Sequence, residues 1–170
     1  MYRANARLTA THPYGSPWYS WPLMTRSIFY WNSDQQTGDR PGEQHKIYLV
    51  GNPIVWWGSS AAIFFLFFAL RDPQQRTFPA LFIMGGYGIS LVPFVGISRV
   101  MFLYHYLTAL VFAILLLTYL LDQGAKKQDH AWLAVAILAA LFFVYFAPLT
   151  YGLPLSPGQY ESRLWMKSWQ

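Results

Sequence analysis

The sequence predicts an all-α integral membrane protein in which four transmembrane helices follow an aromatic-rich N-terminal arm. Hydrophobic residues make up 55% of the 170 positions and charged residues only 11%, whereas soluble domains carry roughly 25% charged residues. The charged residues are also missing from four long tracts, and each tract can hold the about 20 apolar residues that cross a bilayer. These uncharged tracts are residues 47–70, 77–98, 100–121 and 131–160.

The arm, residues 1–46, is polar, interrupted by proline and dense in aromatic side chains. Because Trp and Tyr concentrate where apolar and wet surfaces meet, we expect the arm to lie along the membrane surface. Within it we expect a short helix near residues 24–31 and a solvated loop over 34–44. The tail, residues 150–170, carries two prolines and two tryptophans, and we expect it to be irregular and interfacial.

The four predicted helices cover about 53–70, 78–95, 100–121 and 131–149. The first has start signals, since Asn52 is a good N-cap and Pro53 suits the first helical position. The second contains Gly85, Gly86 and Gly88, which allow a neighbouring helix to approach closely. The domain organisation is therefore an arm, a four-helix membrane domain over 47–149 and a tail.

The basic residues of the loops predict the orientation of the chain. The loops after the first and third helices hold Arg71, Arg76, Lys126 and Lys127, whereas the loop between the second and third helices holds Arg99. Basic loops stay in the cytoplasm. We therefore expect these two loops to be cytoplasmic, and the arm and the tail to be extracytoplasmic.

The composition also excludes several classes of function. The chain has no cysteine, so it has no disulfides, no thiolate nucleophile and no Cys-ligated metal. Its net charge of +5 suits anionic headgroups or a phosphate-bearing ligand. The basic residues are dispersed, which argues against nucleic acid as a partner. We find no metal-ligand spacing, no Gly-rich phosphate loop, no Ser-His-Asp arrangement and no convincing general base.

The first candidate site lies where the third predicted helix enters the membrane. It combines Arg99 with Tyr104, His105 and Tyr106. A permanent cation at this depth needs an anion or water, and the planar guanidinium suits a phosphate. The alternative is that Arg99 reaches up to lipid headgroups and His105 bonds another helix.

Helical geometry limits how these residues could cooperate. An ideal helix separates Arg99 and His105 by about 120° in direction and roughly 9 Å along the axis. The two could therefore share one phosphate only if Arg99 sits in the loop before the helix. Tyr106 would share the Arg99 face of a continuous helix, which makes it the better partner.

The second candidate lies in the arm, where Trp18 and Trp21 could form a sugar-stacking or lipid-anchoring surface beside His12. By spacing alone, a simple interfacial aromatic belt is the better explanation of the two tryptophans.

Four segments of the chain carry distinctive motifs. They are His12-Pro13-Tyr14 with Ser16-Pro17-Trp18 and Trp21-Pro22-Leu23, the run Gly-Asn-Pro-Ile-Val-Trp-Trp at 51–57, Arg99 with Phe102-Leu103-Tyr104-His105-Tyr106, and the run Pro-Leu-Thr-Tyr-Gly-Leu-Pro-Leu-Ser at 148–156. In this order, the four segments resemble the protein O-mannosyltransferase family. Together they cover nearly the whole chain. The matching region of the family is its C-terminal four-helix membrane domain.

The resemblance implies the C-terminal part of a GT-C type glycosyltransferase. Such enzymes move mannose from a polyprenyl- or dolichyl-phosphate carrier to Ser or Thr hydroxyls of exported proteins, with inversion at the sugar. It implies a lipid-linked donor substrate and no cofactor, and it leaves the metal requirement open. By resemblance, Arg99, Tyr104, His105 and Tyr106 hold the phosphate of the carrier. The same resemblance implies that His12, Trp18 and Trp21 lie on the outer face of the membrane domain, near the active-site cavity of the family.

The chain also departs from the family. The acidic catalytic residues of the family belong to an N-terminal half outside this sequence, so we expect a fragment, or a chain completed by an N-terminal half on another chain. The extra lumenal domain of eukaryotic relatives is absent, which favours a bacterial plasma membrane over the endoplasmic reticulum. Two alternatives stay open, namely a non-catalytic membrane scaffold or accessory subunit, and a related lipid-phosphate-sugar transferase with another sugar or acceptor.

Overall fold

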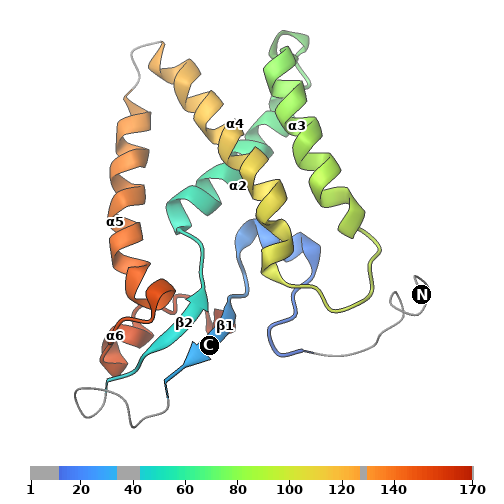
Figure 1. The fold of residues 1–170 in the computed structure, drawn as a ribbon. Helices are drawn as coiled ribbons and strands as arrows, with labels where there is room; N and C mark the ends of the chain where they lie inside the picture. The colour runs from blue at the N-terminus through green and yellow to red at the C-terminus, as the bar shows by residue number, and fades with distance from the viewer. Residues whose placement is uncertain (1–11, 34–42, 127–129, 170) are drawn as a thin grey trace.

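The computed structural model describes residues 12–33, 43–126 and 130–169 of the chain. Four apolar helices run alternately up and down, and the arm, a β-hairpin and the tail gather at one end (Figure 1), which we call the arm end. The loops joining α2 to α3 and α4 to α5 lie at the opposite end. The helices are α2 (Pro53–Ala69), α3 (Phe78–Leu91), α4 (Leu107–Ala125) and α5 (Ala131–Tyr151).

The arm forms a hairpin where a helix was predicted. Strand β1 (Ile28–Asn32) pairs antiparallel with β2 (Lys46–Leu49), so both the short helix near 24–31 and a strictly all-α fold were wrong. The physical reason is that β1 carries an Ile-Phe-Tyr-Trp run, whose side chains suit a pleated, half-buried surface. A 3₁₀-helix (Trp18–Leu23) precedes the hairpin. Most of the predicted loop over 34–44 lies outside the described residues.

The start of α2 follows the prediction made from its sequence. The Asn52 side chain accepts hydrogen bonds from the backbone N–H groups of Ile54 (3.1 Å) and Val55 (3.3 Å), so the predicted N-cap is confirmed. Its Nδ2 also donates to the carbonyl of Ala139 in α5 at 2.7 Å. One side chain therefore caps α2 and ties it to α5.

The contact between α3 and α4 uses one of the three predicted glycines. A Cβ on Gly86 would lie 2.3 Å from the Phe112 ring, whereas a Cβ on Gly85 or Gly88 would meet nothing within 4 Å. Close approach at Gly85 and Gly88 was therefore a wrong prediction. The reason is that residues on other faces of one helix cannot all meet the same neighbour.

The third membrane helix begins later than the predicted start at residue 100. After α3, a 3₁₀ turn (Val92–Phe94) leads into a non-helical loop, and the chain becomes helical only at the 3₁₀ turn Leu103–Tyr106, which continues into α4. Gly96 in this loop has φ +83°, a value that suits glycine. Arg99 therefore lies in the loop and not on the helix.

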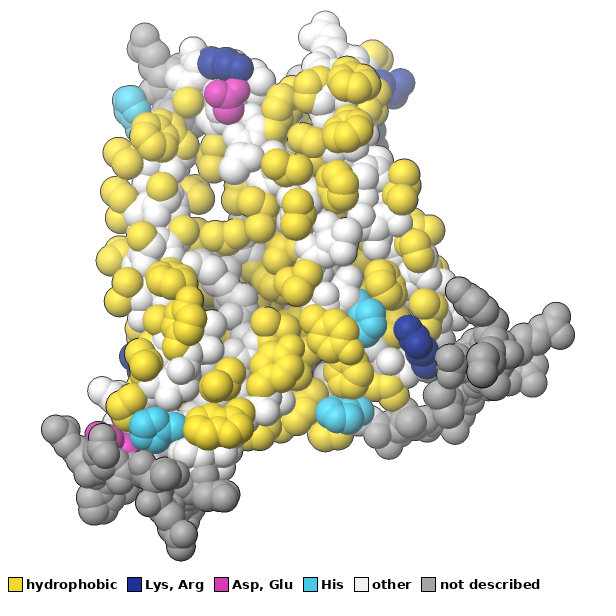
Figure 2. Space-filling view, viewed as in Figure 1, with side chains coloured by type: hydrophobic (Ala, Val, Ile, Leu, Met, Phe, Trp, Pro, Cys, Tyr) yellow, Lys and Arg dark blue, Asp and Glu magenta, His cyan; other side chains and the backbone are white. Residues whose placement is uncertain are grey.

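Among the residues that the structure describes, two helical segments are long and apolar enough to cross a bilayer by length and composition, Leu103–Ala125 and Ala131–Tyr151. The apolar helices Pro53–Ala69 and Phe78–Phe94 are shorter. Only 11% of the most apolar window of α5 is buried inside the protein. Figure 2 shows hydrophobic side chains covering the helices along their length, with the charged side chains confined to the two ends.

The tail is more ordered than predicted. Helix α6 (Pro157–Glu161) starts with a capping box between Ser156 and Gln159, and a 3₁₀ turn (Lys167–Trp169) follows. Trp169 is fully buried and its indole N–H donates to the Met24 carbonyl at 2.8 Å. The tail is therefore not simply irregular, because capping and this buried anchor hold it against the arm.

Candidate functional site

The arm and the α3–α4 loop together form a hollow of about 320 Å³ at the arm end. The backbone N–H of Ser16 donates to the carbonyl of Met101 at 2.8 Å and joins the two segments. Two sets of residues that the sequence presented as separate candidates therefore meet in one place. The hollow, called the Arg99 hollow below, is lined by His12, Gly15, Ser16, Pro17, Ile97, Ser98, Arg99, Val100 and Met101.

Arg99 is exposed in this hollow. Within the described part of the chain, its guanidinium makes no ion pair or hydrogen bond, and no carboxylate lines the hollow. Helical geometry allows Arg99 and His105 to share one phosphate only if Arg99 lies in the loop before the helix. Arg99 does lie in that loop. An unneutralised guanidinium in a hollow is a binding group for an anion.

His12 supplies a second group that suits an anion. Its Nδ1 accepts the backbone N–H of Tyr14 at 3.2 Å, which places the proton of the neutral ring on Nε2, where it can be donated. The ring packs edge-on against Phe102, with centroids 5.0 Å apart. Arg99 and His12 therefore offer a charge and a hydrogen-bond donor from two segments of the chain that line the hollow.

Trp21 and His105 pack behind the lining of the hollow, since Trp21 bonds the lining residue Ser16 and His105 stacks on Trp21. Trp21 is fully buried, and its indole N–H donates to the Ser16 hydroxyl at 3.0 Å. The His105 ring stacks on Trp21 at 5.8 Å and 10°, and its Nδ1 bonds the Phe102 carbonyl at 2.9 Å. Both residues position the lining of the hollow and do not line it.

The other predicted site residues lie elsewhere. Tyr106 is fully buried and its hydroxyl bonds that of Tyr87 at 3.2 Å, so its expected partnership with Arg99 was wrong, because no continuous helix connects the two. Tyr104 is exposed and stacks on His105 with centroids 4.5 Å apart. Trp18 is half-buried beside its neighbours and lies outside the hollow.

The structure adds Gly15, Ser16 and Ser98 to the lining, which the sequence did not single out. A Cβ on Gly15 would lie 3.1 Å from both the His12 carbonyl and the Val100 side chain, so glycine allows the arm to approach the loop. The Pro-Tyr-Gly-Ser-Pro run at 13–17 was the available signal, because glycine between prolines marks a turn.

The chemistry of the Arg99 hollow is that of anion binding. The described residues contain no group of three or more His, Asp or Glu side chains that could hold a metal ion. Among the described residues that line the hollow, no carboxylate stands ready to remove a proton from a hydroxyl. The hollow can therefore hold a phosphate.

Comparison with known proteins identifies the family. The family model described as the C-terminal four TMM region of protein-O-mannosyltransferase matches residues 1–169. The chain belongs to the protein O-mannosyltransferase family. The resemblance seen in the sequence is thereby confirmed, and the membrane character of the chain with it, since the family description names a transmembrane region.

Curated relatives come from fungi and animals. Dolichyl-phosphate-mannose--protein mannosyltransferase 1 of Saccharomyces cerevisiae is 31% identical over 99% of this chain and 22% of its own length. Protein O-mannosyl-transferase 1 of Mus musculus is 30% identical over 93% of this chain and 24% of its own length. The chain thus spans about a quarter of the curated relatives that it matches.

The fold also matches a solved structure. The S. cerevisiae protein O-mannosyltransferase Pmt1-Pmt2 complex bound to the sugar donor aligns with a TM-score of 0.83 and 25% identity. The alignment covers 99% of this chain and 25% of that chain. The chain therefore shares its fold with the matching quarter of that yeast protein.

Proposed function

We propose that this chain is the C-terminal membrane part of an enzyme that moves mannose from a polyprenyl- or dolichyl-phosphate carrier to Ser or Thr of exported proteins. The observation that carries the proposal is the unneutralised Arg99 in a hollow at the end of apolar helices. A carrier lipid has the same construction, since an anionic phosphate sits on a long apolar chain. Arg99 and His12 hold the phosphate, and His105 and Trp21 position them.

We further propose that all four helices cross the bilayer and that the arm (1–46) and tail (150–170) are extracytoplasmic. The alternating helix directions place the loops with Arg71, Arg76 and Lys126 together at the far end (Figure 1). Such a cluster favours the cytoplasmic side. Helix α2 has 17 residues, which meets the lower limit of about 17 for a crossing.

The proposal assigns catalysis to the part of the enzyme that this chain does not contain. The catalytic carboxylates belong to an N-terminal half, either on the same polypeptide or on another. A partner subunit is part of the proposal, since the matched structure is a complex of two mannosyltransferases. The bacterial plasma membrane stays our prediction for the location, although the relatives named above come from yeast and mouse.

Lipid binding tests the Arg99 hollow directly. We expect the chain in nanodiscs to bind polyprenyl phosphate more tightly than the uncharged polyprenol. Arg99→Ala should weaken binding of the phosphate by about tenfold or more, because a charge-assisted contact is lost. Arg71→Ala is the matched control, since Arg71 is exposed at the opposite end and packs on Phe68. Equal effects of the two variants would contradict the site.

Transfer assays test the assignment of function. The 170-residue chain alone should give no measurable mannose transfer, since a missing base costs about 10²- to 10⁴-fold in rate. When the chain is completed by an N-terminal half, Arg99→Ala should raise KM for the lipid donor and leave KM for the acceptor peptide unchanged. Turnover by the chain alone would refute the proposal, and an inactive completed enzyme would favour an accessory subunit.

A further inference from the structure

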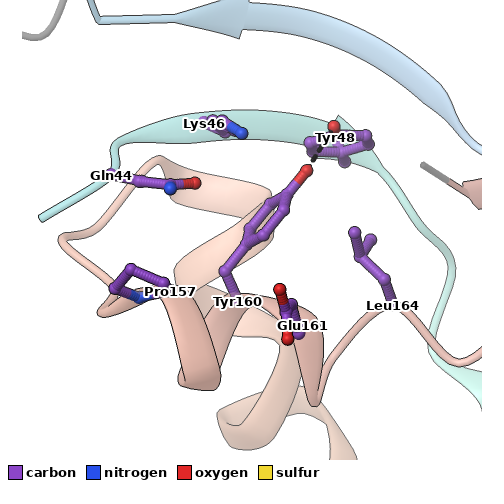
Figure 3. Close-up of a pocket in the computed structure, with 7 residues that line it drawn as sticks. All are labelled: Gln44, Lys46, Tyr48, Pro157, Tyr160, Glu161 and Leu164. Atoms are coloured by element: carbon purple, nitrogen blue, oxygen red, sulfur yellow. Dashed lines mark hydrogen bonds between the residues drawn. The ribbon is translucent and has the colours of Figure 1, made fainter. Parts of the chain in front are cut away.

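A second pocket lies at the arm end, between the hairpin and the tail (Figure 3). Its volume is about 420 Å³, within the roughly 300–1,000 Å³ of ligand pockets. None of the described residues lines both this pocket and the Arg99 hollow. Its lining includes Gln44, Lys46 and Tyr48 from the hairpin side, and Tyr160 and Glu161 from α6.

The two walls of this pocket are fixed to one another. The backbones of Gln44 and Leu155 exchange hydrogen bonds of 2.8 and 3.1 Å, which ties the strand side to the tail. The hydroxyls of Tyr48 and Tyr160 bond at 2.5 Å across the pocket. Segments more than a hundred residues apart in the chain therefore form a preorganised site, and preorganisation lowers the cost of binding.

The phenols of the pocket present neutral hydroxyls and ring surfaces. Burial raises the pKa of Tyr48 above its usual value, and the hydrogen bond with Tyr160 raises it further. The Tyr48 hydroxyl is therefore protonated at neutral pH. The Lys46 ammonium lies 4.2 Å from the centre of the Tyr160 ring, which is a cation–π contact. Lys46 thus sits at the edge of the pocket with N–H groups to donate.

The pocket also holds acceptors that lack donors. The Gln44 Oε1 is buried and has no hydrogen-bond partner among the described residues, which is costly for a polar atom unless a ligand bonds it. Figure 3 shows the Gln44 side chain reaching along the pocket above Tyr160, with Glu161 on the opposite side. In the part of the chain that the structure describes, the Glu161 carboxylate forms no ion pair.

From these contacts we propose that the pocket binds a hexopyranose unit, such as the mannose of a glycan presented at the arm end. A pyranose has hydroxyls that donate to Gln44 and Glu161 and accept from Lys46. Its C–H faces suit the tyrosine rings. A phosphate would be repelled by the Glu161 carboxylate. Because the pocket holds one positive group, Lys46, and one negative group, Glu161, it favours a neutral ligand. A peptide backbone N–H could satisfy Gln44 but offers no comparable set of hydroxyls.

Saturation-transfer NMR on the chain in nanodiscs tests the proposal. The probes are methyl α-mannopyranoside, a mannosylated Ser/Thr peptide, the same peptide without sugar, and inorganic phosphate. We expect saturable binding of the mannoside and of the mannosylated peptide, with transfer to the ring protons of the sugar. The bare peptide and phosphate should neither bind nor compete. Binding of the mannoside alone would restrict the site to free sugars.

Variants locate the binding in this pocket. Glu161→Gln and Gln44→Leu each remove one acceptor function at nearly constant volume, and each should weaken mannoside binding about 3- to 10-fold. The controls Asp122→Asn and Tyr151→Phe make similar chemical changes outside the pocket and should leave binding unchanged. Circular dichroism confirms that each variant is folded.

Three results would overturn the proposal: no saturable mannoside binding, competition by phosphate or by the bare peptide, or equal binding by the pocket variants and the controls. Arg99→Ala should retain full mannoside binding, since Arg99 is not part of this pocket. The two sites can therefore fail independently.

Discussion

The arm end and the helix bundle are held together by different forces. At the arm end, indole N–H groups donate to backbone carbonyls. Trp21 bonds Ser16 within the arm, and three pairs join different segments, namely Trp56 with Trp21, Trp57 with Leu23, and Trp169 with Met24. Between the described parts of the helices, side-chain hydroxyl pairs are few, namely Thr77 with Tyr119 and Tyr87 with Tyr106. Trp combines a large apolar surface with one donor, which suits an interface. In hydrocarbon, helix association instead depends on close packing of small residues.

The largest expected effect tests the indole network. Trp21→Ala removes a fully buried ring that supports the Arg99 hollow and should destabilise the fold by about 3–5 kcal/mol. Polyprenyl-phosphate binding should fall with it. Trp18→Ala should destabilise the fold clearly less, because the Trp18 side chain is only half-buried. Unfolding in mixed detergent micelles measures both, and equal losses would mean that burial at Trp21 has no special role.

The next prediction tests packing in the bundle. Gly86→Ala puts a methyl group into the place of the Phe112 ring and should cost about 1–3 kcal/mol by overpacking. Gly85→Ala is the matched control, because its Cβ would meet nothing within 4 Å. It should be neutral or slightly stabilising, since alanine favours the helix. If both variants behave alike, close approach at Gly86 does not hold α3 to α4.

A smaller effect is expected at the boundary of the two regions. Asn52→Ala removes the cap of α2 and the bond to Ala139, and should cost about 1–2 kcal/mol. Asn52→Ser keeps a capping oxygen and loses the amide donor, so it should cost less. Thermal unfolding of the two variants separates the cap from the helix–helix bond. A Ser variant as unstable as the Ala variant would assign the whole effect to the bond.

The smallest effect is expected at the opposite end of the bundle. Asp122 and Lys126 form an exposed ion pair of 2.7 Å one turn apart on α4. Because solvent screens such pairs, Asp122→Asn should change the free energy of unfolding by about 0.5 kcal/mol or less. A loss as large as that of Asn52→Ala would show that this end is more rigid than its exposure indicates.

The helices could be predicted because their signals are local. Asn52-Pro53 marks the start of α2, and the uncharged tracts mark where the chain is apolar. The hairpin was missed because its two strands each lack a clear alternation and pair across a loop. The Arg99 hollow was predicted in parts, since Arg99 and His12 were both named, but nothing local indicated that the arm meets the α3–α4 loop. The Tyr48–Tyr160 pocket had no sequence signal at all.

The sequence by itself determined that the chain is apolar, membrane-bound and similar to the protein O-mannosyltransferases, because charge distribution and short motifs are properties of neighbouring residues. Only the tertiary structure decided that Tyr106 is buried, that Arg99 stands in a loop and that Tyr160 faces Tyr48. Those outcomes depend on contacts between segments far apart in the chain, which no local pattern encodes.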